Sequence, residues 1–267
     1  MPTADVNGLS LFYRIDGDEG APAVLLITGL SGDSRMWAGL IPKLAESFRV
    51  IAFDNRDSGR SDRADAPYAI LDMARDAAGL LESLGVSRAH VVGHSMGSAI
   101  AQEIAISFPS IVDRLVLLGT YDAPDPRGAA LFRGFASLRR EMPRDEYLRL
   151  TLPWSFTYLE YEQPEFIDWL VQIVMDDPYY QEPDAYERQM EATIAFDSRG
   201  RLQDISSPTL LVFGEDDVLT PMRFAHEMLQ RIEGSRLVTL QGTGHGFITT
   251  RGREIVDAVY GFLREGG

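Results

Sequence analysis

The sequence of 267 residues contains no cysteine, so disulfides, thiolate nucleophiles and cysteine-based zinc sites are excluded. No apolar run approaches the roughly 18 residues that a membrane-spanning helix needs. Residues 1–5 show neither the basic region nor the apolar region of a signal peptide. We therefore expect a cytoplasmic protein that crosses no membrane.

Basic residues are also scarce. The 25 Lys and Arg residues stand against 40 Asp and Glu residues, which gives a formal net charge of −15 at pH 7. Nucleic acids and anionic membranes bind through basic patches, which would have to overcome this repulsive background. We expect neither as a partner and expect a small molecule instead. Nothing in the sequence indicates an oligomeric state.

Short apolar runs alternate with segments of helical character, at residues 37–48, 70–84 and 98–108. Continuous apolar runs are typical of strands buried on both faces, and their alternation with helices predicts a mostly parallel sheet. A β-hairpin with an Asn7-Gly8 turn is expected before them. The predicted strands are residues 23–28, 49–53, 89–92, 115–118 and 209–213, followed by 236–240.

Residues 93–97 read Gly-His-Ser-Met-Gly and join a predicted strand to a predicted helix. They fit the G-x-S-x-G nucleophile elbow, in which a sharp strand-to-helix turn exposes the serine hydroxyl. The flanking glycines permit a close backbone approach that a Cβ would obstruct. We predict that Ser95 is a nucleophile; the alternative is a glycine-rich turn with an idle serine.

A serine nucleophile needs a base and a third group that orients the base. Of the four histidines, His90 lies in a predicted strand, His226 lies on a predicted helix, and His94 faces away from the nucleophile in a sharp turn. Structural or solvated roles suit these three. His245 lies in a glycine-rich segment late in the chain, which matches the order serine, acid, histidine. We predict that His245 is the base.

Asp217 is the predicted acid. It closely follows the strand at 209–213, where a carboxylate can reach the histidine Nδ1. Glu215 and Asp216 are interpreted as solvated neighbours. Two alternatives remain open: this acidic turn only caps the next helix, or the acid is Asp122, after the strand that follows the elbow.

Two backbone N–H groups are candidates for stabilising a tetrahedral oxyanion. The elbow supplies the N–H of Met96, the residue after the serine. The flexible turn at residues 29–32 follows the strand at 23–28, and its best-placed donor is the N–H of Leu30.

The strand and helix alternation stops after residue 118 and resumes at 209. Residues 121–204 hold 14 of the 26 aromatics and seven prolines. We predict a helical cap at 121–204, inserted into a core formed by 1–120 and 205–267. The aromatics either fill the core of this small layer or line an apolar pocket over the serine. Candidates for the pocket are Trp154, Phe156, Tyr158 and Trp169.

Several stretches together resemble the α/β-hydrolase superfamily over nearly the whole chain, namely residues 28–30, 54–61, 93–97, 214–221 and 244–246. The resemblance implies an α/β-hydrolase fold, with an eight-stranded, mostly parallel sheet flanked by helices and a helical lid after the sixth strand. Among its subgroups the chain is similar to small cofactor-free serine esterases and lactonases around 3-oxoadipate enol-lactonase. This similarity implies hydrolysis of carboxylic esters or lactones through an acyl-enzyme on Ser95, with no cofactor and no metal.

Two departures from the superfamily pattern stand out. Thr28 occupies the place of a frequent histidine, so only a backbone role can be carried over to this loop. Asp57 stands where glycine is common. We interpret Arg56, Asp57 and Arg60 as a charge cluster that steadies the loop, with substrate contact as the alternative.

Other activities remain open at this level. The same three residues serve enzymes that cleave C–C bonds of vinylogous diketones and enzymes that form peracids, and a non-catalytic protein of this fold can hold a small ligand. Haloalkane dehalogenase and epoxide hydrolase chemistry is disfavoured, since similar enzymes carry aspartate in place of Ser95. In the predicted cap, Arg133, Arg139 and Arg140 are either exposed charges or partners for a substrate carboxylate.

Overall fold

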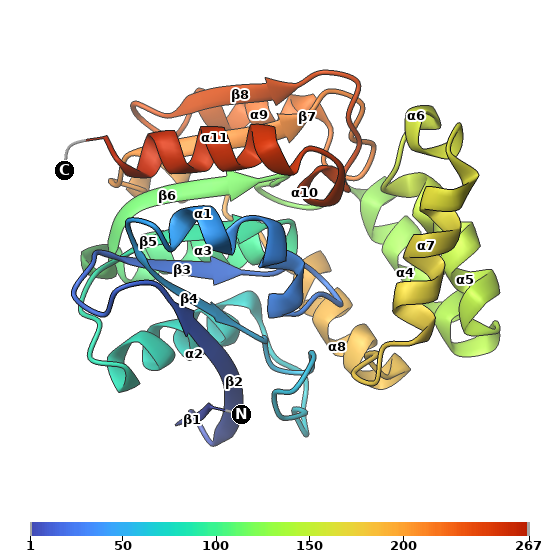
Figure 1. Ribbon diagram of the computed structural model, residues 1–267, viewed down its shortest axis with the longest axis horizontal. Coiled ribbons are helices and arrows are strands. Elements are labelled where there is room, and N and C mark those ends of the chain that lie inside the picture. The colour runs from blue at the N-terminus through green and yellow to red at the C-terminus, as the bar shows by residue number, and fades with distance from the viewer. Residues whose placement is uncertain (1, 266–267) are drawn as a thin grey trace.

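The computed structural model describes residues 2–265, which form one central sheet of eight strands (Figure 1). The spatial order is β1-β2-β4-β3-β5-β6-β7-β8. The β1–β2 and β2–β4 pairs are antiparallel and every other pair is parallel, which confirms the expected mostly parallel sheet. The strands are β1 Thr3–Val6, β2 Leu9–Asp16, β3 Ala23–Ile27, β4 Arg49–Phe53, β5 Ala89–His94, β6 Val112–Leu118, β7 Thr209–Gly214 and β8 Arg236–Leu240.

The predicted hairpin is confirmed, with β1 and β2 joined by Asn7 and Gly8. Both turn residues have positive φ, at 50° and 80°, as a two-residue type I′ turn requires.

Helices cover both faces of the sheet (Figure 1). Helices α2 (Ile70–Ser83), α3 (Met96–Ser107) and α9 (Met222–Leu229) pack on one face. The 3₁₀ helix η1 (Ser34–Gly39) and helices α1 (Ile41–Leu44) and α11 (Gly252–Leu263) pack on the other, and the short α10 (Phe247–Thr250) precedes α11. All residues of α3 from Met96 to Ala105 are buried, because its small residues let the helix lie close to the sheet.

The predicted helix at 37–48 is wrong in detail, because the structure contains η1 and the separate four-residue α1 instead. Pro42 lies in the first turn of α1. A proline has no N–H to donate to the preceding turn, so one continuous helix cannot run through this position.

Between β6 and β7 the chain leaves the sheet and forms five α-helices. They are α4 Pro126–Glu141, α5 Arg144–Thr151, α6 Tyr158–Tyr161, α7 Pro164–Met175 and α8 Pro183–Ile194. Prolines start α4, α7 and α8, where the missing N–H costs nothing. Helices α4, α5, α7 and α8 share a small core that includes Phe135, Tyr147 and Tyr186. We call residues 121–204 the helical cap; its boundaries stay those predicted from the sequence.

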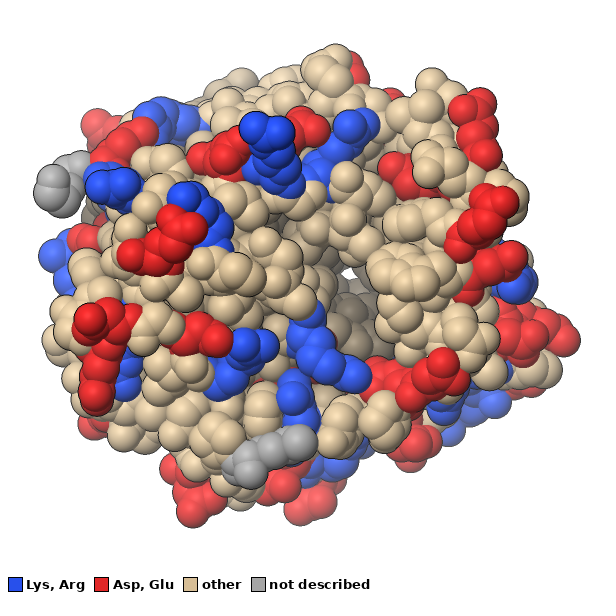
Figure 2. Space-filling model, in the orientation of Figure 1, with Lys and Arg blue, Asp and Glu red and all other residues tan. Residues whose placement is uncertain are grey.

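The space-filling view shows the molecule hollowed where the helical cap meets the rest, with mostly uncharged residues around the hollow (Figure 2). No helix within residues 2–265 is long and apolar enough to cross a membrane.

Candidate active site

Ser95 lies at a sharp turn between β5 and α3. Its φ of 55° and ψ of −121° lie in a region that residues with a side chain rarely occupy, as the nucleophile elbow requires. A Cβ on Gly93 would lie 2.2 Å from the carbonyl oxygen of Gly97, and a Cβ on Gly97 would lie 2.2 Å from that of Ile27. Both glycines are therefore needed for the turn to pack against the sheet.

The structure brings Ser95, His245 and Asp217 together in one hydrogen-bonded row. Ser95 Oγ lies 2.9 Å from His245 Nε2, and His245 Nδ1 lies 2.6 Å from Asp217 Oδ2. The three residues come from the turns that follow β5, β8 and β7, at one edge of the parallel sheet. This arrangement can move a proton away from the serine hydroxyl.

The Asp217 carboxylate is buried and fixed on both oxygens. Oδ1 accepts hydrogen bonds from the N–H groups of Leu219 and Thr220, each at 2.8 Å, and Oδ2 accepts one from the Thr220 hydroxyl at 2.6 Å. Burial alone would raise the pKa of Asp217, but His245 and the Thr220 bonds outweigh it and lower the pKa below its ordinary value. Asp217 is thus an anion suited to orient His245.

The loop that carries His245 is held by the helical cap. The N–H of Gly246 donates a hydrogen bond to the carbonyl oxygen of Ser155 at 2.7 Å. A Cβ on Gly244 would lie 2.7 Å from that oxygen, and a Cβ on Gly246 would lie 2.4 Å from the Phe156 ring. The glycines on both sides of His245 therefore allow this loop to touch the cap.

His94 packs beside the reacting groups but does not join the row. Its ring lies 4.9 Å from the His245 ring, and its Nε2 lies 3.3 Å from the His245 carbonyl oxygen. Burial, together with the nearby His245, lowers the pKa of His94 to about 3. His94 is therefore neutral near pH 7 and supports the His245 loop.

The remaining sequence candidates lie elsewhere. His90 is buried in β5, 3.3 Å from the Asp113 carboxylate, and His226 is exposed on α9. The Asp122 carboxylate is buried, accepts a hydrogen bond from the Ala123 N–H and lies 3.8 Å from Arg231. Asp217, and not Asp122, meets His245.

The loop after β3 passes directly over Ser95. A Cβ on Gly29 would lie 3.0 Å from Ser95 Cβ, so a side chain there would crowd the nucleophile. Gly32 donates to the Gly29 carbonyl oxygen, which closes a tight turn around Leu30, and Ser31 has a φ of 66°. Leu30 and Met96 lie with Ser95 around one pocket, as an oxyanion site formed by their N–H groups requires.

Gln189 of α8 holds this turn from the cap. Its side-chain oxygen accepts the Ser31 N–H at 3.1 Å, and its side-chain nitrogen donates to the Arg56 carbonyl oxygen and to Ser58 Oγ. Gln189 is fully buried. The sequence did not point to Gln189, because a glutamine 158 positions away from Ser31 carries no local signal.

The members of the predicted charge cluster, Arg56, Asp57 and Arg60, pair with other residues and not with one another. Arg56 pairs with Asp76 and Arg60 pairs with Asp54. Asp57 is buried, with a φ of 67°, and pairs with Arg188 of α8 at 2.6 Å. Each has a partner within the protein, and the Asp57 pair ties this loop to the cap.

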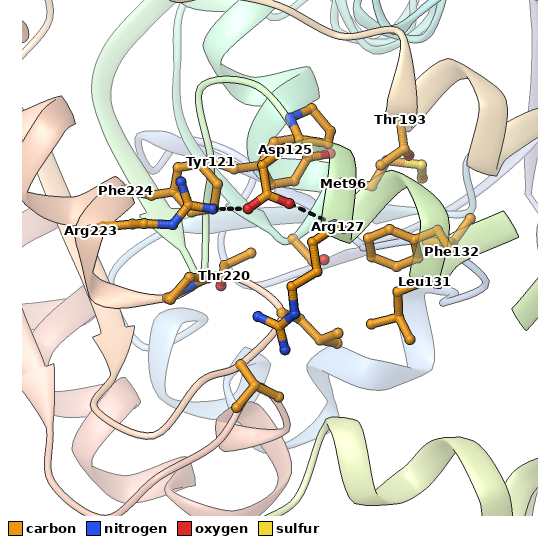
Figure 3. Close-up of a pocket in the computed structure, with 17 residues that line it drawn as sticks. Met96, Tyr121, Asp125, Arg127, Leu131, Phe132, Thr193, Thr220, Arg223 and Phe224 are labelled. Carbon is orange, nitrogen blue, oxygen red and sulfur yellow. Dashed lines mark hydrogen bonds and ion pairs between the residues drawn. The ribbon is translucent and has the colours of Figure 1, made fainter. Parts of the chain in front are cut away.

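Ser95 lies where two pockets meet, and Leu30, Phe132 and Leu219 also line both. The first, the apolar pocket, has a volume of about 40 Å³ and lies between Leu131 and Phe132 on one side and Tyr121 and Phe224 on the other (Figure 3). An ion pair between Asp125 and Arg223 lies at its edge (Figure 3). The rest of its lining is mainly apolar, with Arg127 as a further charged member.

The second, the cap pocket, has a volume of about 310 Å³ and extends beneath the helical cap. Its lining includes Arg139, Tyr147, Tyr186 and His245. The cap pocket holds most of the space beside Ser95.

The structure corrects most of the predicted pocket aromatics. Phe156 does line the cap pocket. Trp154 packs on Phe135 in the cap core, whereas Tyr158 and Trp169 are 68% and 50% exposed and line neither pocket. Phe132 and Phe135 line the cap pocket instead and lie three residues apart on one face of α4. Their spacing was visible in the sequence, but not which face of the helix points to Ser95.

A model of the alpha/beta hydrolase fold family matches residues 22–251. This chain belongs to the α/β-hydrolase family. It is 28% identical to the proposed carbamate hydrolase RutD of Caulobacter sp. (strain K31), over 98% of each chain. It is 30% identical to the protein of the same name from Pseudomonas savastanoi pv. phaseolicola (strain 1448A / Race 6), over 84% of this chain and 87% of the relative.

Among solved structures, the chain is similar to the enol-lactonase from Burkholderia xenovorans LB400. The TM-score is 0.89 and the identity 29%, over 99% of this chain and 100% of the other. Within residues 2–265, no group of three or more Asp, Glu or His side chains could hold a metal ion.

Proposed function

We propose that this protein is a serine hydrolase that cleaves a small carboxylic ester or lactone through an acyl-enzyme formed on Ser95. The observation that carries the proposal is the row from Ser95 Oγ through His245 to the buried Asp217. The similarity to an enol-lactonase and to proteins named as carbamate hydrolases supports hydrolysis at a carbonyl carbon.

The reaction starts when His245 Nε2 takes the proton of the Ser95 hydroxyl while Oγ attacks the carbonyl carbon. The negative charge on the carbonyl oxygen is stabilised by the N–H groups of Leu30 and Met96. The carbonyl re-forms as the C–O bond breaks, and His245 gives its proton to the leaving alkoxide. For a lactone, this alcohol stays attached to the acyl group.

Hydrolysis of the acyl-enzyme repeats these steps with water. His245 accepts a proton from the water, whose oxygen attacks the ester carbon, and then returns the proton to Ser95 Oγ as the acid leaves. Asp217 stays ionised throughout and stabilises the charged imidazole ring. No step requires a cofactor or a metal.

The test has two stages. A fluorophosphonate probe should label Ser95 in the parent protein, and Ser95→Ala should not be labelled. A panel of esters, lactones and carbamates should then show multiple turnover, with kcat reduced on the order of 10⁶-fold in Ser95→Ala.

Two results would overturn the proposal. A Ser95→Ala protein that keeps most of its turnover would exclude Ser95 as the nucleophile. A protein that is labelled but turns over none of the panel would be better described as a small-ligand-binding protein of the same fold, or as an enzyme for diketones or peracids.

A further inference from the structure

Two buried hydroxyl groups close to the nucleophile are left without hydrogen bonds. Tyr121 follows β6 and is 5% exposed, and Thr193 lies on α8 and is 2% exposed. Within the part of the chain that the structure describes, neither hydroxyl oxygen has a hydrogen-bond partner. Most buried polar groups are hydrogen-bonded, and an unsatisfied one costs free energy, so two such groups in one place require an explanation.

Both hydroxyl groups belong to side chains that line the apolar pocket, together with Ser95 (Figure 3). The ring of Tyr121 packs edge-on against the rings of Phe196 and Phe224, with ring centres 6.1 Å and 6.4 Å away. Thr193 comes from the last turn of α8. The loop after β6 and helix α8 therefore each supply one hydroxyl group, held by its element, to the wall of the pocket that contains the nucleophile.

At least one of the two hydroxyl protons is free to donate. Burial raises the pKa of Tyr121, and the neighbouring Thr193 hydroxyl opposes this effect only in part, so Tyr121 keeps its proton near pH 7. Each hydroxyl carries one proton. A contact between the two groups would use one of these protons and leave the other available.

The apolar pocket lies on the acyl side of the reacting carbonyl group. His245 gives its proton to the leaving alkoxide, so the alcohol part of the substrate must lie beside His245. His245 lines the cap pocket but not the apolar pocket, whereas the proposed oxyanion donors Leu30 and Met96 both line the apolar pocket. The acyl chain therefore points into the apolar pocket. Its volume of about 40 Å³ accepts only a few atoms, since a single water requires roughly 10–15 Å³.

We propose that Tyr121 and Thr193 bind a neutral oxygen atom on the acyl chain, so that the substrate is an ester or lactone of a short oxo or hydroxy acid. The inference rests on the proposed function of Ser95. A ketone or hydroxyl oxygen accepts a hydrogen bond from the free proton of either side chain. An alkyl chain of the same length would leave both hydroxyl groups unsatisfied, and a site with such buried groups discriminates against the analogue that lacks the oxygen.

The test compares two esters of equal length, 4-nitrophenyl 4-oxopentanoate and 4-nitrophenyl pentanoate, which differ by a ketone oxygen in place of two hydrogens. The parent should prefer the oxo ester. Tyr121→Phe and Thr193→Val each remove one hydroxyl group, and combined they should lower the ratio of the two kcat/KM values by about three- to tenfold. Because parent and variant are compared on the same two esters, any difference in the intrinsic reactivity of the esters cancels.

The free energy of unfolding, measured in urea, gives a second readout. Because the described residues supply neither hydroxyl group with a partner, Tyr121→Phe and Thr193→Val should leave the stability unchanged or raise it. Thr209→Val is the matched control, since Thr209 is equally buried but its hydroxyl donates to the Ser207 carbonyl oxygen at 2.9 Å. This control should lower the stability and leave the ester preference unchanged.

Two results would overturn the inference: a double variant that keeps the parent's ratio of kcat/KM values, or one that loses both activities equally, as a purely structural role predicts. Binding of methyl 4-oxopentanoate and methyl pentanoate to Ser95→Ala, followed by ligand-observed NMR, provides a readout without turnover. If the oxo ester binds more tightly, and loses this advantage when both substitutions are added, while the parent cleaves no ester, the oxygen site stands and the proposed hydrolysis fails. If the parent cleaves esters and the double variant keeps its preference, only the present inference fails.

Discussion

Replacing Asp217 by asparagine is the sharpest test of how His245 is oriented. The two carboxylate oxygens have different partners: Oδ1 accepts from two backbone N–H groups at 2.8 Å, and Oδ2 meets the Thr220 hydroxyl and His245 Nδ1, both at 2.6 Å. An asparagine oxygen can replace only one of them. The structure therefore determines which way the amide turns.

The amide oxygen should face the two backbone donors. In the opposite orientation its NH₂ group would oppose two N–H groups, and each buried donor left unsatisfied costs about 1–3 kcal/mol. The NH₂ group therefore faces His245 and donates to Nδ1, which moves the ring proton to Nε2. A protonated Nε2 cannot accept the proton of Ser95.

The expected loss follows from this wrong tautomer. The same exchange lowers kcat by about 10⁴-fold in the serine protease that serves as the template for such triads. At about 1.36 kcal/mol for each factor of ten, this corresponds to roughly 5.4 kcal/mol of lost transition-state stabilisation. KM should change little, since Asp217 lines neither pocket.

Steady-state kinetics on the best ester of the panel measures the effect, and thermal unfolding checks that the variant folds. Asp122→Asn is the matched control, because Asp122 is also buried and follows a parallel strand but has no contact with His245. The kcat of this variant should stay within about threefold of the parent. If Asp217→Asn keeps kcat within tenfold of the parent, the assignment of Asp217 is wrong.

Three further changes test other parts of the site. Gly97→Ala should lower the free energy of unfolding by about 3 kcal/mol in urea titrations, because its Cβ would lie 2.2 Å from the Ile27 carbonyl oxygen. Gly134→Ala is the control, since this position on α4 faces open space, and it should be neutral or stabilising. Equal effects of the two substitutions would contradict the packing argument. Gln189→Leu removes the oxygen that accepts a hydrogen bond from the Ser31 N–H. It should lower both kcat and the affinity for a boronic acid transition-state analogue by about tenfold. If only the stability changes, Gln189 is a packing residue. His94 has a pKa of about 3 in the folded protein and about 6.5 in the unfolded chain. Between these pH values the unfolded chain binds more protons than the folded protein. The free energy of unfolding therefore falls as pH drops below 6.5, by up to about 1.4 kcal/mol per pH unit. His94→Gln should flatten the dependence of the unfolding free energy on pH between 6 and 4, and an unchanged slope would contradict the buried neutral ring.

The strands and the row of reacting residues were predictable because their signals are local. Continuous apolar runs mark strands buried on both faces, and the five predicted runs overlap β3 to β7, while the strand-like stretch at 236–240 is β8. Since the carboxyl ends of parallel strands share one edge of a sheet, residues that follow three such strands must come close together. For this reason, Ser95, His245 and an acid after a parallel strand could be expected in one site, and the structure then shows that the acid beside His245 is Asp217 and not Asp122.

The pocket could not be predicted in the same way, because its lining depends on which helix face turns toward the core. Trp169 lies on α7, where apolar residues occur on more than one side, and it stacks on Phe166 with half of its surface exposed. Tyr186 and Arg139 come from helices that the sequence could not orient relative to each other. Composition therefore indicated that the cap is aromatic, but not which rings face Ser95.

The cap contacts imply that the cap contributes to catalysis as well as to the choice of substrate. In the cap, Gln189 accepts a hydrogen bond from the N–H of Ser31, the residue next to the proposed oxyanion donor Leu30. Ser155, also in the cap, accepts one from the N–H of Gly246, the residue next to His245. A shift of the cap would therefore move an oxyanion donor and the base at once, while Ser95 stays fixed by β5 and α3. Because misplacing a catalytic group by about 1 Å can lower the rate 100-fold, substitutions far out in the cap should reduce kcat as well as change KM.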